Sequence, residues 1–298
     1  MNWLFFALLA PAIYAIVVFV DKYILEKEIR DYRGIPIYSA LAAFVFGILL
    51  WVITGFPILG FRDAVLIIFT GMLTIFGLAT YFKVLSSDEA SKVTILFQMT
   101  PVIILIMAYL FLKETIGFNQ LLGFLLILFA TLGISVDKKG LAWNLSSSFF
   151  LILLTDFLWA SAYVLFKFVV NANSFTKVIS FESFGMAFGG LFLYIFFPSI
   201  KKSFLKTKKK IKKKVFGFIF INESIFVASR LCTYLAISLG PVALVEVVAG
   251  TQVFFAIFYG VILTLIAPKI FKENISKEGL IRKIMMGIFV LLGLYLVR

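Results

Sequence analysis

Residues 93–136 read VTILFQMTPVIILIMAYLFLKETIGFNQLLGFLLILFATLGISV, and this stretch decides the fold. It contains two apolar runs, 93–112 and 117–136, on either side of a short break that opens with Lys113 and Glu114. The hydrocarbon core of a bilayer takes about 20 helical residues to cross. Both runs have that length, so we predict two transmembrane helices joined by a tight connection.

Apolar runs of similar length recur along the whole chain between short polar breaks. The first run lacks a basic segment before it and a small-residue cleavage site, so we expect it to be retained rather than removed as a signal. The last run is short and begins with Arg282 and Lys283, which makes its boundary the least defined. We predict ten spans, at 3–22, 35–54, 65–85, 93–112, 117–136, 149–170, 178–197, 215–239, 242–267 and 281–297.

The composition agrees with this pattern. Hydrophobic residues make up 62% of the chain and charged residues 14%, against about 45–50% and about 25% in soluble domains. The fold class is therefore an all-α polytopic membrane protein with ten transmembrane helices. Only the connection 198–215 could hold a small extramembrane element, so no soluble catalytic domain is expected.

Several chemistries are excluded by the residues that the chain lacks. Histidine is absent and Cys232 is the only cysteine, so His-based triads, His metal ligation and an intrachain disulfide are excluded. The chain contains no G-x-x-x-x-G-K-[ST] loop, which argues against ATP-driven transport by this chain alone. We expect no catalytic residue, no cofactor and no metal site, and hence not an enzyme.

Charge predicts the orientation. The net charge is +13, and most of the 28 lysines and arginines fall in alternate connections, including the Lys-rich loop at 199–214. Basic residues translocate poorly, so we place this loop in the cytoplasm of a prokaryotic cell and both termini outside its cytoplasmic membrane. Residues 201–214 are expected to contact anionic headgroups rather than a nucleic acid, which electrostatics alone would not recognise specifically.

Ten helices divide into two sets of five, 1–140 and 141–298, and an odd number of helices in each set requires the second to be inverted. Several pairs of residues recur in the same order in both halves. They are Tyr14, Ala15 and Lys22 with Trp159, Ala160 and Lys167; Thr80 and Tyr81 with Thr233 and Tyr234; Ala90 with Ala243; and Lys113-Glu114 with Lys272-Glu273.

The same residues carry a family resemblance. Residues 90–133, with Pro101 in mid-helix, then Glu114, Gln120 and Gly123, resemble the EamA-type repeat of the drug/metabolite transporter superfamily. The helices that lead to Lys22 and Lys167 are similar to the opening helix of each such repeat. The resemblance implies two inverted five-helix repeats that move small solutes, often exporting metabolites, and it does not fix a substrate. The second half departs from the pattern, with Gln252 or Phe254 where Pro101 stands.

Charged residues inside the predicted spans are concentrated in the second half, at Asp156, Glu182, Glu223, Arg230 and Glu246. A charged side chain at mid-membrane costs about 2.5–3.5 kcal/mol, so we expect all five to face the interior of the bundle. Arg230 is expected to pair with Glu182 or Glu246. Asp156 or Glu223 could then take up and release a proton during a transport cycle. The alternative is that these groups make interhelical hydrogen bonds that only hold helices together.

Other candidates are neutral. Gln98 and Gln252 occupy nearly equivalent positions in the two halves and could bind a solute or another helix. Lys167 stands at a helix end and is expected to reach the headgroups, and the Gly185-containing stretch to permit close helix packing. The aromatic residues that we expect to line a cavity are Tyr14, Tyr81, Trp159 and Tyr234.

These observations predict a secondary transporter that moves a small metabolite or amphiphilic solute by alternating access, as an exporter and with proton coupling. The cavity is expected at mid-membrane between the first, third, fourth, sixth, eighth and ninth spans. The alternatives are a lipid-linked flippase and a membrane-embedded scaffold or sensor. The expected partners are the solute and membrane lipids, and the sequence leaves a monomer and a homodimer both open.

Overall fold

The computed structural model of the chain describes residues 2–24, 31–87, 97, 99–135, 147–210, 213–266 and 277–298. These residues are helical apart from short turns and connections and contain no strand. The elements are α1 (Trp3–Tyr23), η2 (Tyr32–Gly34), α2 (Ile35–Ile53), α3 (Phe61–Ser87), α5 (Met99–Met107), η3 (Ala108–Leu112), α6 (Phe118–Ser135), α7 (Ser147–Ala172), α8 (Phe175–Phe196), α9 (Pro198–Lys210), α10 (Lys213–Leu239), α11 (Val242–Ala249), α12 (Gln252–Ile266) and α13 (Lys277–Val297).

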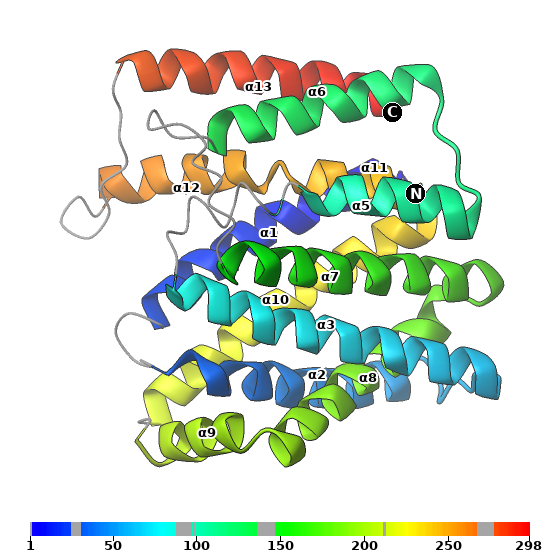
Figure 1. Cartoon of the computed structure of the whole chain (residues 1–298), viewed down its shortest axis with the longest axis vertical. Coiled ribbons are helices and arrows are strands. Elements are labelled where there is room, and N and C mark those ends of the chain that lie inside the picture. The colour runs from blue at the N-terminus through cyan, green and yellow to red at the C-terminus, as the bar shows by residue number, and fades with distance from the viewer. Residues whose placement is uncertain are drawn as a thin grey trace.

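Most of the helices lie side by side in one bundle, with both termini towards the same end (Figure 1). The most extensive contacts join α3 to α7 and α8, α1 to α10, and α2 to α8. Helices α6 and α13 pack against each other at one edge of the bundle (Figure 1). Neighbours in space are therefore drawn from both halves of the chain.

Seven helices in the described residues are long and apolar enough to cross a membrane. Three shorter apolar helices, Met99–Leu112, Phe118–Gly133 and Ile284–Val297, lie within the fourth, fifth and tenth predicted spans. The multiple apolar helices establish an integral membrane protein, while the count of ten transmembrane helices stays a prediction. Large apolar side chains such as Phe61 and Leu291 point outwards, as lipid-facing surfaces require.

The span predicted at 242–267 contains one of the seven membrane-length segments, Val242–Gly260, but its helix is interrupted. Helix α11 ends at Ala249 and α12 begins at Gln252, with the tight bonds Gly250 N–H to Val247 O (3.2 Å) and Thr251 N–H to Val248 O (2.9 Å) between them. Glycine is a poor helix former, which favours a break at this position. The stretch expected as a Lys-rich loop is also helical, because α9 covers Pro198–Lys210.

Small residues bring α3 and α8 together, as expected for the stretch that contains Gly185. A Cβ atom added at Gly185 would meet the backbone carbonyl of Ile68, and one added at Gly71 would meet the backbone of Glu182. Glycine at these positions lets the two backbones touch. The close contact fixes Glu182 beside α3, in the interior of the bundle.

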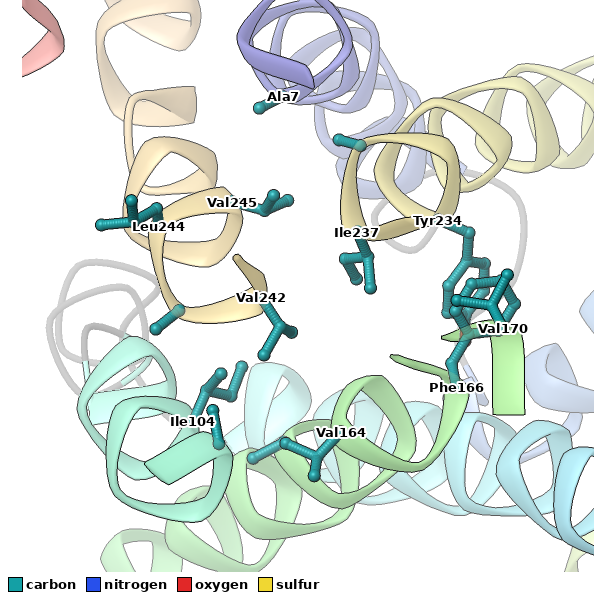
Figure 2. Packing of buried hydrophobic residues seen from close by; sticks show 14 of the residues in the cluster. Ala7, Ile104, Val164, Phe166, Val170, Tyr234, Ile237, Val242, Leu244 and Val245 are labelled. Atoms are coloured by element: carbon teal, nitrogen blue, oxygen red, sulfur yellow. The ribbon is translucent and has the colours of Figure 1, made fainter. Parts of the chain in front are cut away.

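The core around α11 is apolar. All residues from Val242 to Val248 are buried, and Figure 2 shows Val242, Leu244 and Val245 among side chains of α1, α5, α7 and α10. Glu246 is the one acidic residue of this helix. Packing of the neighbouring apolar side chains therefore fixes the position of its carboxyl group.

Candidate functional site: a cavity inside the bundle

A cavity of about 460 Å³ lies inside the bundle and is lined by residues of α1, α3, α5, α7, α10, α11 and α12. These helices correspond to the first, third, fourth, sixth, eighth and ninth predicted spans, which are the spans expected to surround it. Most of the wall is apolar or aromatic. The aromatic residues of the wall are Tyr14, Phe19, Tyr81, Phe97, Trp159, Tyr163, Phe226 and Tyr234.

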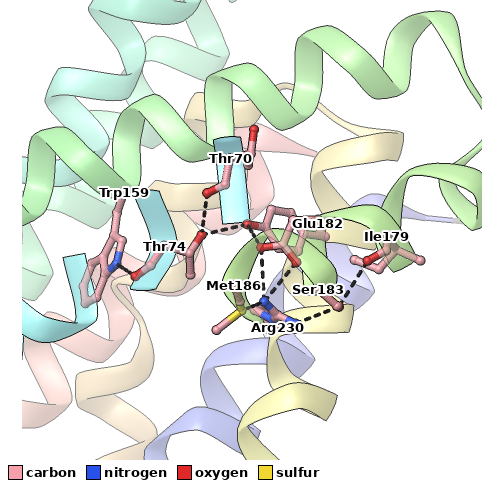
Figure 3. A network of polar contacts seen from close by, with 9 residues as sticks. Thr70, Thr74, Trp159, Ile179, Glu182, Ser183, Met186 and Arg230 are labelled. Atoms are coloured by element: carbon pink, nitrogen blue, oxygen red, sulfur yellow. Dashed lines mark hydrogen bonds and ion pairs between the residues drawn. The ribbon is translucent and has the colours of Figure 1, made fainter. Parts of the chain in front are cut away.

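Three of these rings form a continuous aromatic surface. The rings of Phe97 and Trp159 are stacked with their centroids 5.5 Å apart, and Tyr81 lies 5.5 Å from Phe97 and 5.8 Å from Trp159. The indole nitrogen of Trp159 donates a hydrogen bond to the Thr74 carbonyl at 3.3 Å (Figure 3). Trp159 also packs against Gly77, where a Cβ atom would meet the indole. The surface is thus held in one orientation before any solute arrives.

A buried ion pair forms another part of the site. Arg230 on α10 lies 2.9 Å from the carboxylate of Glu182 on α8, and these side chains are 5% and 0% exposed. Arg230 also donates to the Ser183 hydroxyl at 3.1 Å and contacts the Met186 sulfur (Figure 3). The sequence left Glu182 and Glu246 open as partners of Arg230, and the structure selects Glu182.

Tyr234 extends this network across the bundle. Its hydroxyl donates to Glu182 at 3.1 Å and lies 3.4 Å from the Thr74 hydroxyl. Its ring stacks on Phe166 with the centroids 4.0 Å apart. Within the Arg230–Glu182 ion pair, Arg230 lines the cavity, whereas Glu182 does not. A solute would therefore meet the guanidinium group with its counterion behind it.

Glu246 lines the cavity as well, and it is only 7% exposed. Its Oε1 atom has no hydrogen-bond partner among the described residues. Gln252, at the beginning of α12, lines the cavity two residues beyond Gly250. A carboxyl group from α11 and an amide from α12 thus lie at the cavity wall, on either side of the break between the two helices.

The other predicted residues lie elsewhere. Asp156 is fully buried behind the wall and accepts a hydrogen bond from the Thr100 hydroxyl at 2.7 Å. Glu223 accepts one from Ser39 at 2.9 Å and lines a second, much smaller cavity. Gln98 lies outside the described residues. The structure thus brings seven of the eleven candidates to one cavity wall: Tyr14, Tyr81, Trp159, Arg230, Tyr234, Glu246 and Gln252.

The expectation that Lys167 reaches the headgroups is wrong. Its side chain is buried, and its ammonium group donates to the carbonyls of Ile237 (2.8 Å) and Gly240 (3.0 Å) at the end of α10. Glu114 lies 3.8 Å from this ammonium group and accepts from the Val242 N–H at 3.0 Å. Helix ends attract opposite charge in this manner, so the pair fastens the junction of α10 and α11. The side chain of Lys22 lies outside the described residues.

Sequence reasoning missed several polar residues of the interior. Ser229 lines the main cavity and donates to the Ala10 carbonyl at 2.9 Å, while Asp21 and Asn222 line the small one. Asp21 stands near the end of a predicted span, where a charge needs no special explanation. In the sequence, Asp21 is distinguished only by its position inside the predicted span, directly before the terminal Lys22. No group of three or more His, Cys, Asp or Glu in the described part of the chain could hold a metal ion.

Comparison with known proteins agrees with this architecture. Among solved structures 27 chains match, and one crystal structure of a protein is similar with a TM-score of 0.67 and 13% identity, over 99% of this chain and 94% of that chain. At this identity the similarity shows the fold alone. No curated protein sequence matches the chain.

Fold and cavity together define the class of a polytopic helical membrane protein with a polar and aromatic site in its interior. The model of the EamA-like transporter family matches residues 1–136. The match confirms the family resemblance, and it does so in the first predicted repeat. This family consists of transporters rather than enzymes.

Proposed function

We propose that the protein is a secondary transporter that moves a small amphiphilic solute through the cavity by alternating access. The observation that carries the proposal is the cavity itself. Its volume of about 460 Å³ falls in the range of about 300–1,000 Å³ that is usual for small-molecule sites. It lies between helices of both halves of the chain, where transporters built from repeats hold their substrates.

Contacts between helices support two inverted repeats. In chain order, α1 corresponds to α7, α2 to α8, α3 to α10, α5 to α11 with α12, and α6 to α13. With this correspondence, the contact α3–α7 is the counterpart of α1–α10, and α5–α7 is the counterpart of α1–α12. The contacts α2–α8 and α6–α13 then each join corresponding helices. A two-fold axis in the membrane plane requires that contacts recur in such pairs and that corresponding helices meet near the axis. Rocking of one repeat against the other would then open the cavity to either side.

The chemistry of the wall favours a cationic or zwitterionic solute with a flat apolar body. The aromatic surface of Tyr81, Phe97 and Trp159 would receive the apolar body, and Glu246 a positive group. Arg230 would bind an acidic group on the same solute. Export from the cell, and proton coupling through a carboxyl group of the interior, complete the proposal. Among the carboxyl groups, Glu246 faces the cavity most directly, ahead of Asp156 and Glu223.

Membrane lipids are the second proposed partner. On α9, Phe204 packs against Tyr38 and Tyr194 with ring centroids 5.0 and 6.0 Å apart, whereas Lys202 and Lys206 are exposed. An amphipathic helix with lysines on its outer face suits the cytoplasmic surface of a membrane. We propose that α9 lies along that surface and contacts anionic headgroups.

Flux measured in proteoliposomes tests the proposed function. Vesicles loaded with a metabolite mixture, with and without a pH gradient, would compare wild type with Trp159→Ala and Glu246→Gln. Trp51→Ala is the matched control, because Trp51 packs on Phe56 away from the cavity. We expect gradient-dependent flux that Trp159→Ala and Glu246→Gln abolish and Trp51→Ala retains. Absence of flux for every solute, or equal flux in all variants, would contradict the proposal.

A further inference from the structure

A second cavity, of about 10 Å³, lies beside the first. Its polar lining consists of Tyr14 and Asp21 on α1, Ser39 on α2, and Asn222 and Glu223 on α10. Tyr14 lines both cavities. A volume of this size admits about one water molecule or one small ion, and it is too small for an organic solute.

Two carboxyl groups share this small space. Glu223 is 6% exposed, and none of the ion pairs between described side chains includes Asp21 or Glu223. Hydrogen bonds to one oxygen of each group come from Ser39 (2.9 Å) and Asn222 (2.7 Å). An ionised carboxylate that is buried inside a membrane protein is costly unless a cation or another partner faces it. A cation between the two groups would offset this cost.

Asn222 supplies an independent indication of a ligand. Its side chain is 2% exposed, and its Nδ2 donates to Asp21. A carboxylate only accepts hydrogen bonds, so the amide cannot be turned round without losing this bond. Its oxygen, Oδ1, is then left without any donor. A buried oxygen in this position is costly unless a donor or a cation occupies the space in front of it.

The oxygen atoms and the size of the cavity select the ion. Carboxylate, amide and hydroxyl oxygens suit hard cations. Mg²⁺ usually keeps several waters, for which this cavity has no room. Ca²⁺ takes 6–8 oxygen ligands, whereas the lining offers five once the carboxylate oxygens that accept from Ser39 and Asn222 are set aside. We propose that Asp21, Asn222 and Glu223 bind one Na⁺ ion, with the hydroxyls of Tyr14 and Ser39 beside it. The ion goes beyond the proposed function, which assigns no metal.

Direct binding of ²²Na⁺ to the purified full-length protein in detergent tests this site. We expect saturable binding of one ion per chain, displaced by excess Na⁺ and not by choline. Glu223→Gln and Asp21→Asn should each weaken the affinity by at least about tenfold, because even loss of a group that only supports a metal ligand typically costs about 10–100-fold. Asp63→Asn is the matched control, because Asp63 binds Asn173 and lines neither cavity.

Two results would overturn the site. One is the absence of saturable ²²Na⁺ binding to folded wild-type protein, which needs no variant. The other is unchanged affinity in both carboxylate variants, each shown to be folded by size-exclusion chromatography. Displacement by Ca²⁺ at lower concentration than by Na⁺ would also contradict the choice of ion. Binding is measured without solute or transport, so failure here and failure of the proposed function are separate results.

Discussion

Arg230 and Glu182 show what a single pair of residues contributes in this interior. Both side chains are almost fully buried and 2.9 Å apart. Breaking a buried pair by removing one partner costs about 3–5 kcal/mol, because the remaining charge loses its compensation. We therefore expect Glu182→Gln to lower the free energy of unfolding by about that amount, measured by thermal and denaturant unfolding in detergent.

The exposed pair Arg33–Asp31 provides the control for this prediction. Its atoms are similarly close, at 2.8 Å, but the side chains are 49% and 30% exposed, and such pairs contribute about 0–1 kcal/mol. Asp31→Asn should hardly change stability. An equal effect of Glu182→Gln and Asp31→Asn would show that burial does not determine the strength of the Arg230 pair. A double variant, Arg230→Met with Glu182→Leu, should recover part of the loss.

Residues of the site differ in how far the sequence could predict them. An arginine in an apolar span needs a counterion, so a partner for Arg230 was predictable, while the choice between Glu182 and Glu246 depends on how α8 and α11 pack. Lys167 was not predictable in the same way. Its partners are backbone carbonyls at Ile237 and Gly240, about 70 residues away in sequence, and hydropathy carries no information about them.

At the scale of elements, the contact between α3 and α8 depends on glycine. A Cβ atom at Gly185 would collide with the backbone of Ile68, which cannot move aside like a flexible side chain. We expect Gly185→Ala to cost about 1–3 kcal/mol or more, as overpacking does, and to displace Glu182 from Arg230. Unfolding measurements and size-exclusion profiles in detergent would reveal the loss.

Gly217 on α10 is the matched control, since a Cβ atom there meets nothing within 4 Å. Gly217→Ala should leave stability unchanged or raise it by about 0.5–1 kcal/mol, because alanine favours a helix interior over glycine. Destabilisation by Gly217→Ala of the same size as by Gly185→Ala would mean that helix propensity, and not the close contact, decides the outcome.

Elements were predictable where the signal is local. Twenty apolar residues indicate a helix regardless of their neighbours, which is why the spans that became α1, α2, α7 and α8 lie close to their observed bounds. The break at Gly250 and Thr251 was missed because a hydropathy window averages over one tightened turn, in which the backbone bonds join residues three apart. Helix α9 was missed for the opposite reason, since its many lysines give a mean hydropathy typical of a connection.

At the scale of the whole molecule, the distribution of charge predicts how the bundle sits in the membrane. Figure 1 shows α9 towards one end of the bundle and both termini towards the other. Lysines concentrate in α9 and the connections on its side, and such loops stay in the cytoplasm. The expected orientation therefore places α9 inside the cell and the connection between α2 and α3 outside.

The single cysteine of the chain makes this orientation testable. In a Cys232→Ala background, Gly60→Cys introduces a thiol between α2 and α3, and Lys202→Cys introduces one on α9; both positions are exposed. A membrane-impermeant maleimide applied to intact cells should label Gly60→Cys, and should label Lys202→Cys only after the membrane is permeabilised. The opposite pattern would mean that the bundle is inserted the other way round, because its two ends face different compartments. Labelling of both variants in intact cells would instead indicate mixed insertion, which the strong lysine asymmetry argues against.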